Sequence, residues 1–298
     1  MNVFARIGVG WAGSYVMTRA FARAIPGEPT IAVVADMLNR LDLLAAGELD
    51  LTWVFPRARV DWAYQGRRPW PDSPWRGEPL SNLRLVARFP RIDRELIAVA
   101  PWSPVSNLAE IAQHKQVRIA MRTDELYEYE SAIFDQYGYT LADVERGGGR
   151  YWHIATGAHE LDRELAEQAV DIVIGHAWYT PPWKVVADRG FRFIPVDERV
   201  VEALEKVGFE RQVIEPGALP GISEPLLTLD LGDQILVSRA EVDDDVIYRI
   251  ARSIDTNKRA IGQASQGQTE ELSRQWETKL VPLHPGAERY YREAGYLP

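Results

Sequence analysis

Short apolar runs alternate with amphipathic stretches along the first part of the chain. Phe4–Val9 and Thr30–Ala35 are rich in apolar and β-branched residues, which is typical of buried strands. Between them, the apolar residues from Val16 to Ile25 recur with the spacing of one helical face. A helix at 38–46 and a strand at 49–55 continue the alternation. This order predicts a largely parallel sheet covered by helices.

The alternation is interrupted at residues 56–82, which are rich in proline, tryptophan and arginine. We interpret this stretch as a surface excursion, with the pair Arg67-Arg68 as solvated surface. Strand and helix patterns then restart. The further elements that we expect are strands at 95–100, 116–121, 170–175 and 191–196, helices at 126–137 and 160–168, a short helix starting at 106–111, and an extended stretch at 226–238.

The length of 298 residues exceeds the size at which a single core usually divides. We therefore expect two α/β lobes, residues 1–96 with 233–298 and residues 97–232. The two crossings between the lobes, near 95–101 and 228–238, are the expected hinges.

Composition narrows the choice of partners. A net charge of −9 argues against nucleic acid or an anionic membrane surface as the main partner. Because cysteine is absent, disulfides, thiolate nucleophiles and cysteine-bound metals are excluded. No run approaches the roughly 18 apolar residues that a membrane-spanning helix needs, so direct membrane insertion is not expected.

The first 25 residues superficially resemble a signal peptide, with Arg6 followed by a weakly apolar stretch. Glycine and serine interrupt this stretch repeatedly, which favours a strand, a turn and a helix. If the protein is exported, we expect that its signal was removed and replaced by Met1.

Gly8, Gly10 and Gly13 form a G-x-G-x-x-G pattern between a predicted strand and helix, and Asp36 follows the next strand. This arrangement is typical of dinucleotide binding. The pattern is weak on its own, because any α/β lobe that binds ligand at a helix N-terminus favours small residues in this turn. An NAD(P)-dependent enzyme therefore stays as an alternative.

The C-terminal segment Val281–Tyr296, with Leu283-His284-Pro285-Gly286 near its start, closely resembles the closing motif of TAXI-family receptors, the solute-binding proteins of TRAP transporters. The stretch Asn39–Leu51 resembles the helix-to-strand segment of the same family. Further matching segments, in chain order, are Pro79–Leu85, Ser106–Glu110 and Leu236–Asp245. The resemblance covers nearly the whole chain.

The resemblance implies a two-lobed periplasmic-binding-protein-like fold with the ligand cleft between the lobes. It implies a periplasmic receptor that closes over a small carboxylate-bearing solute, such as an amino acid or an organic acid. We expect the receptor to be a monomer, and the aromatic and arginine residues that depart from the family pattern add a bulkier or aromatic acid to the expected solutes. The receptor would hand the solute to TRAP membrane subunits. Neither catalysis nor a cofactor is expected, and the alternatives are an enzyme on the same scaffold or a ligand-sensing module.

The chain departs from the family pattern where ligand contacts are expected. Arg122 and Thr123 occupy a turn that is usually rich in glycine, serine and threonine, and Arg122 can clamp a carboxylate or pair with Asp124 or Glu125. Gly13 and Ser14 lie at a predicted helix N-terminus, where they bind an anion or cap the helix.

Aromatic residues also follow several predicted strands. Trp11, Tyr15, Phe55, Trp178 and Tyr179 either line an aromatic cleft or belong to the core. His176 follows the strand at 170–175 and either donates to a ligand or is a structural group. His153 and His159 lie six residues apart in an expected loop and predict no metal site.

Overall fold

The computed structural model describes residues 4–10, 12–34, 37–67, 78–91, 93–121, 127–153, 158–176, 180–265, 275–277 and 281–298. The chain forms two compact units. The first consists of Met1–Ile92 and Gly232–Pro298, and the second of Asp93–Leu231.

A five-stranded sheet with the order β2-β1-β3-β12-β4 forms the centre of the first unit. Its strands are β1 (Arg6–Val9), β2 (Thr30–Val33), β3 (Leu51–Val54), β4 (Leu83–Phe89) and β12 (Gln234–Arg239). β1 pairs in parallel with β2 and β3, whereas β12 is antiparallel to both of its neighbours, β3 and β4. Four of the five strands therefore end at the same edge of the sheet.

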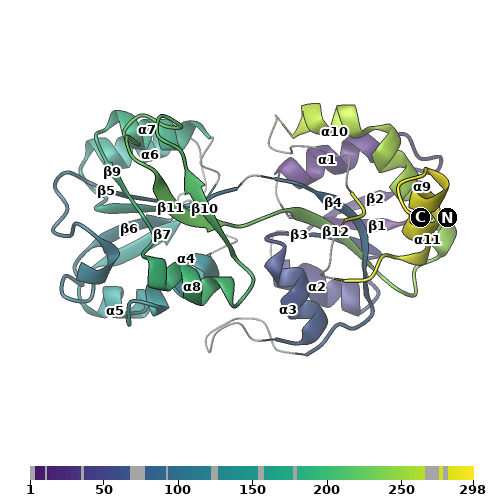
Figure 1. Cartoon of the computed structure of the whole chain (residues 1–298), viewed down its shortest axis with the longest axis horizontal. Helices are drawn as coiled ribbons and strands as arrows, with labels where there is room; N and C mark the ends of the chain where they lie inside the picture. Colours follow the sequence, from purple (N-terminus) through teal and green to yellow (C-terminus); the bar gives the residue numbers. More distant parts are fainter. Residues whose placement is uncertain are drawn as a thin grey trace. The chain divides into compact units, whose positions relative to one another are not determined.

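Helices cover both faces of this sheet (Figure 1). On one face lie α1 (Ala12–Ala22), α9 (Asp244–Thr256), α10 (Lys258–Ala264) and α11 (Pro285–Glu293), and on the other lie α2 (Met37–Ala45) and α3 (Ala58–Gln65). The core under the first group includes Phe21, Trp53 and Phe89, with Trp53 and Phe89 ring centroids 4.6 Å apart.

Helix α9 shows how the sequence directs this packing. Ile247, Ile250 and Ile254 recur on one helical face and are fully buried. At the N-terminus, the Asp243 carboxylate accepts hydrogen bonds from the backbone N–H groups of Asp245 and Val246 at 2.9 and 3.1 Å. This cap satisfies two amides that the helix cannot pair internally.

The C-terminal motif fixes α11 against α9 and the sheet. A Cβ atom on Gly286 would lie 2.1 Å from the Asp244 carbonyl oxygen, so only glycine permits this approach of the two helices. The Tyr291 hydroxyl donates to the Val86 carbonyl at 2.8 Å, and Leu283 forms a parallel bridge to Leu85. The residues that carry the family resemblance here are thus packing residues.

The second unit contains a five-stranded sheet with the order β7-β6-β8-β5-β9. Its strands are β5 (Leu96–Val99), β6 (Arg118–Met121), β7 (Arg150–His153), β8 (Ile172–Gly175) and β9 (Arg192–Ile194). β6 is parallel to β7 and β8, and β5 is antiparallel to β8 and β9. β5 is therefore the single antiparallel strand, as β12 is in the first unit.

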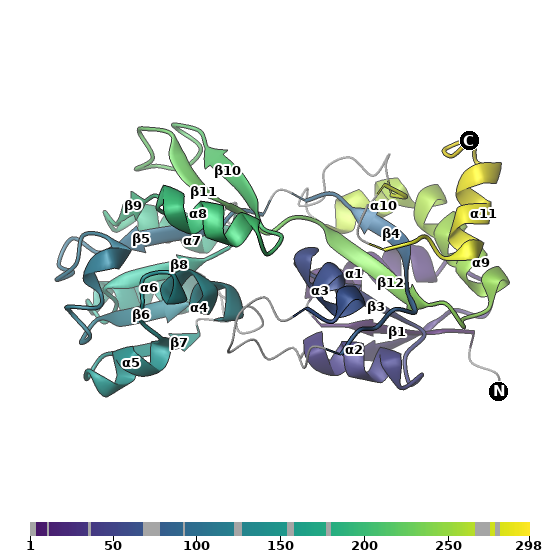
Figure 2. The same cartoon turned by 60° about the horizontal axis from the view of Figure 1, so that its bottom comes forward.

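Helices α6 (Ala158–Ala166) and α7 (Pro181–Asp188) cover one face of this sheet, and α4 (Tyr127–Asp135), α5 (Leu141–Arg146) and α8 (Glu198–Glu205) lie on the other side (Figure 1). A 3₁₀ turn, η1, spans Leu108–Glu110. The strands β10 (Glu210–Ile214) and β11 (Leu226–Asp230) form an antiparallel hairpin beside α8 (Figure 2).

The two sheets repeat one topology. In each, three parallel strands follow the order second, first, third, and a single antiparallel strand separates them from the outermost strand. The antiparallel strand also comes from a different part of the chain in each unit, so the repeat leaves no repeated sequence. The fold is the two-lobed, mostly parallel α/β architecture that the sequence predicts.

Two local expectations were wrong. The stretch 56–82 contains helix α3, which buries Val60, Trp62 and Ala63 and ends at Gly66 with a left-handed backbone (φ 67°). Its prolines flank this helix instead of interrupting it, so composition alone misled the prediction. His153 and His159 lie on β7 and α6, not in a loop. In the parts of the chain that the structure describes, no helix has the length and apolarity needed to cross a bilayer.

Candidate ligand-binding site

The turn between β1 and α1 holds two predicted contact residues in the first unit. Ser14 is fully buried, and its hydroxyl accepts a hydrogen bond from the Gly10 backbone N–H at 3.3 Å. The Thr18 hydroxyl donates to the Ser14 carbonyl at 2.7 Å. Gly13 is half-buried beside Ser14 at the start of α1. In this geometry the Ser14 hydroxyl stabilises the turn itself.

The glycine pattern of this turn has a packing explanation. A Cβ atom on Gly10 would lie 1.7 Å from Nη1 of Arg40, which is fully buried and donates to the Val34 carbonyl at 2.5 Å. A Cβ atom on Gly8 would lie 2.6 Å from Leu49 Cδ1. In dinucleotide-binding turns the second glycine lets the backbone approach a pyrophosphate. Here the Arg40 guanidinium group occupies the space next to that glycine.

Phe55 lies directly after β3 and is almost entirely buried. The Arg91 guanidinium carbon lies 5.0 Å from the centre of the Phe55 ring. The Arg59 guanidinium group donates to the Phe55 carbonyl at 3.3 Å. Arg59 is 4% exposed and Arg91 is 8% exposed, values that are unusual for charged side chains.

Two further arginines meet the same edge of the sheet at Asp233. Arg88 lies 2.5 Å from the Asp233 carboxylate, and Arg57 lies 3.8 Å from it. The backbone N–H of Arg91 donates to the other Asp233 oxygen at 3.3 Å. Arg57 and Arg59 follow β3, Arg88 and Arg91 lie at the end of β4, and Asp233 precedes β12. We call Arg57, Arg59, Arg88 and Arg91 the arginine edge.

Tyr15 does not join this edge. It is 40% exposed and lines a shallow hollow of about 490 Å³ along the outer side of α1, together with Val16, Arg19 and Arg23. Of the contacts predicted in the first unit, Phe55 lies beside Arg59 and Arg91 of the arginine edge. The Ser14 hydroxyl is hydrogen-bonded within its own turn.

In the second unit, His176 follows β8 and is largely buried. Its Nδ1 atom lies 2.7 Å from the Asp93 carboxylate, which is fully buried. The backbone carbonyl of His176 accepts a hydrogen bond from the Trp183 indole at 2.9 Å. Asp93 orients the imidazole ring, and Trp183 holds the backbone that carries it.

Two more buried acids belong to the same region: Glu95, which is close to Asp93, and Glu130, which is close to Glu95. Glu95 directly precedes β5, and Glu130 lies on α4; both are buried. Burial, together with the charges of Glu130 and Asp93, raises the pKa of the Glu95 carboxyl well above its usual value. We call Asp93, Glu95 and Glu130 the acidic group of the second unit.

Several predicted contacts lie outside the described residues: Trp11, Arg122, Thr123, Trp178 and Tyr179. They stay predictions. The arginine edge and the acidic group were both missed from the sequence. For Arg57 and Arg59 a signal was available, because they directly follow a predicted strand whose carboxyl end belongs to the ligand-binding edge of such sheets.

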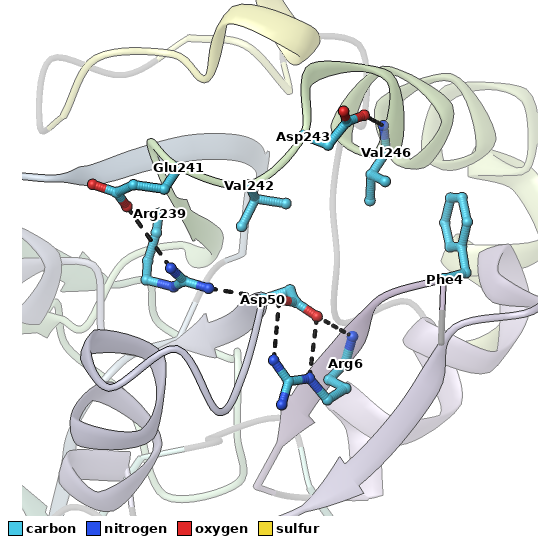
Figure 3. Close-up of a pocket in the computed structure, with 8 residues that line it drawn as sticks. All are labelled: Phe4, Arg6, Asp50, Arg239, Glu241, Val242, Asp243 and Val246. Carbon is cyan, nitrogen blue, oxygen red and sulfur yellow. Dashed lines mark hydrogen bonds and ion pairs between the residues drawn. The ribbon is translucent and has the colours of Figure 1, made fainter. Parts of the chain in front are cut away.

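A further hollow of about 470 Å³ lies at the opposite edge of the first sheet (Figure 3). Figure 3 shows Arg6 and Arg239 directed at Asp50, with a backbone contact from Arg6 at 2.7 Å and a side-chain contact from Arg239 at 3.6 Å. Asp243 turns away to cap α9. The charges of this hollow therefore hold strand ends together.

Comparisons with known proteins agree with this fold. XAC2383 from Xanthomonas citri, in structures bound to chloride ion and to ATP, gives TM-scores of 0.53 and 0.52 at 14% identity. Each alignment covers 98% of this chain and 96% of that chain. PhnD1 from Prochlorococcus marinus, in complex with methylphosphonate, gives a TM-score of 0.49 at 11% identity and covers 98% of both chains.

The chain thus shares the overall fold of XAC2383 over nearly its whole length. A model of the NMT1-like family matches residues 35–295, which is most of the sequence. The match runs through both units and includes the C-terminal helix α11. The chain therefore belongs to the NMT1-like family.

Proposed function

We propose that this protein is an extracytoplasmic solute-binding receptor that binds a small acid and delivers it to the membrane subunits of a transporter. The fold supports the proposal, because open α/β sheets bind ligands at the carboxyl ends of their strands. The resemblance to TAXI receptors supports a TRAP-type transporter as the partner and the periplasm as the location. Hinges near residues 95–101 and 228–238 belong to the same proposal.

The arginine edge carries the proposal of an acidic solute. Four arginines lie at the end of the first sheet where ligands bind in this architecture; the Arg57 and Arg88 guanidinium groups contact the Asp233 carboxylate, and the Arg91 backbone N–H donates to it. Arginine presents a planar fork of donors that matches a carboxylate, and such charge-assisted hydrogen bonds are strong. We infer that Arg59 and Arg91, which are the most buried of the four, hold the acid group.

Phe55 supports an aromatic or bulky acid among the possible solutes. Its ring already stacks near the Arg91 guanidinium group at the same strand end. An aromatic solute gains contact area beside such a ring while its carboxylate stays within reach of the arginines.

A dinucleotide-dependent enzyme is the less supported alternative. Its motif rests on Gly8 and Gly10. A Cβ atom at these positions would collide with the Leu49 and Arg40 side chains, respectively, so packing alone accounts for both glycines. A ligand-sensing module would use the same binding site and differ only in its partner.

Isothermal titration calorimetry tests the proposal. The wild-type protein is titrated with L-amino acids, dicarboxylates, 2-oxo acids and aromatic acids, and with NADH as a control. We expect saturable one-to-one binding of at least one acid and no binding of NADH. Binding of NADH with none of the acids would contradict the proposal, as would the failure of all of these compounds to bind.

A further inference from the structure

The edge of the second sheet that corresponds to the arginine edge carries acids instead. In the repeated topology β8 takes the place of β3, and His176 follows β8 as Phe55 follows β3. β5 pairs with β8 so that Leu96 lies opposite Gly175, which brings Glu95 level with His176. The acidic group thus lies at the carboxyl end of β8, the ligand-binding edge of this sheet.

The acidic group is deeply buried. Asp93 and Glu130 are fully buried and Glu95 is 2% exposed. Asp93 is paired with His176 at 2.7 Å. Both carboxylate oxygens of Glu95 are buried, and neither has a hydrogen-bond partner among the described residues.

A buried carboxyl group without a partner destabilises the folded chain, and neighbouring carboxylates add to that cost. An apolar side chain of similar volume at position 95 would avoid this cost, and an amide would avoid the part that comes from charge. Buried acids in such surroundings are characteristic of functional sites, where a ligand supplies the missing partner. The fitting partner for a carboxylate beside two others is a cation with several N–H donors.

We propose that Glu95, with Glu130 and Asp93 beside it, binds a cationic nitrogen group of the solute. This inference rests on the proposed function and narrows its substrate class: the solute carries a protonated amine or amidine as well as an acid group. Burial raises the pKa of the Glu95 carboxyl, and a cation bound beside it favours the charged carboxylate. His176 is a positioning residue, because its contact with Asp93 fixes that carboxylate.

Matched pairs of probes test the inference by calorimetry. Each pair has the same carbon skeleton and carboxylate, with an amino group in one member and a hydroxyl in the other: L-phenylalanine and L-3-phenyllactate, L-leucine and L-2-hydroxyisocaproate, L-glutamate and L-2-hydroxyglutarate. We expect the amino member to bind at least about tenfold more tightly in the pair that binds best. Glu95→Gln should abolish this preference, whereas Glu198→Gln, at an exposed ion pair with Arg211, should keep it.

The stability of the unliganded protein separates a binding role from a structural one. A ligand-binding Glu95 predicts that Glu95→Gln unfolds at a higher temperature than the wild type, and a structural role predicts the reverse. Equal binding of amino and hydroxy acids would overturn the inference and leave the proposed function standing. Failure of every probe to bind would overturn both. Saturable binding of Mg²⁺ that is lost in Glu95→Gln would also overturn it, because the carboxylates would then belong to a metal site.

Discussion

Gly10 lies against the guanidinium group of Arg40, so closely that a Cβ atom would stand 1.7 Å from Nη1. Arg40 is fully buried under the β1–α1 turn and donates to the Val34 carbonyl. The glycine of an apparent nucleotide motif is therefore explained by one internal side chain. This relationship shows why a sequence motif needs its structural surroundings before it indicates a ligand.

Because of this contact, we expect even alanine, which adds only a Cβ atom, to destabilise the folded protein at position 10. Gly10→Ala should lower the free energy of unfolding by about 1–3 kcal/mol, because the buried Arg40 must move to make room. Urea denaturation measures the change. Gly262→Ala in α10 is the matched control, since no atom lies within 4 Å of a Cβ there, and it should raise stability by about 0.5–1 kcal/mol. Equal effects of the two substitutions would contradict the explanation.

We expect a similar loss of stability when Gly286 of the C-terminal motif is replaced. A Cβ atom there would lie 2.1 Å from the Asp244 carbonyl oxygen, which is backbone and cannot rotate away. Gly286→Ala should therefore separate α11 from α9 and destabilise the chain by about 3 kcal/mol. The thermal unfolding midpoint measures this change, and an unchanged midpoint would show that the helices do not depend on this glycine.

We expect the affinity for the acidic solute to depend on the charge of Arg59. Arg59→Met keeps most of the apolar stem and removes the charge, so it should weaken binding of an acid at least about tenfold, while Arg59→Lys should weaken it less. Arg289→Met is the control, because Arg289 pairs with Asp245 on the surface. Calorimetric titration with the best-bound acid gives the dissociation constants. Retention of full affinity in Arg59→Met would remove the arginine edge from the site.

We expect Glu95 to make the free energy of unfolding depend on pH. Because its pKa in the folded chain is raised above the unfolded value, the folded state keeps the proton while the unfolded state loses it. The wild type should therefore lose stability as pH rises above about 4.5, and Glu95→Gln should not show this part of the loss. The difference in unfolding free energy between the two proteins, measured by urea denaturation, should grow as pH rises above about 4.5. A constant difference would show that Glu95 is ionised in the folded protein.

The sequence predicted the fold well where packing depends on local periodicity. The short apolar runs predicted as strands at 116–121, 170–175 and 191–196 correspond to β6, β8 and β9. Helix α3 was missed because the prolines around it hid a short buried face. The sequence did not reveal that the two sheets share one topology, because the repeat lies in the order in which the strands pair and not in the identity of their residues.

The candidate site was harder to predict. Phe55 was identified because it ends a strand, but its neighbour Arg91 is 36 residues further along the chain, and only pairing through β12 brings the two together. Asp93 and His176 are likewise joined by the pairing of β5 with β8. The chemistry of the two edges thus arises from long-range pairing that a single sequence does not reveal.

Native mass spectrometry tests the central claim, that this protein is a receptor for one small acid, most directly. The wild type and Arg59→Met are each sprayed with the acid that binds best in the calorimetric panel. We predict a single one-to-one complex for the wild type and little or none for the variant. A wild type that retains no acid, or a variant that retains as much as the wild type, would contradict this account of the site.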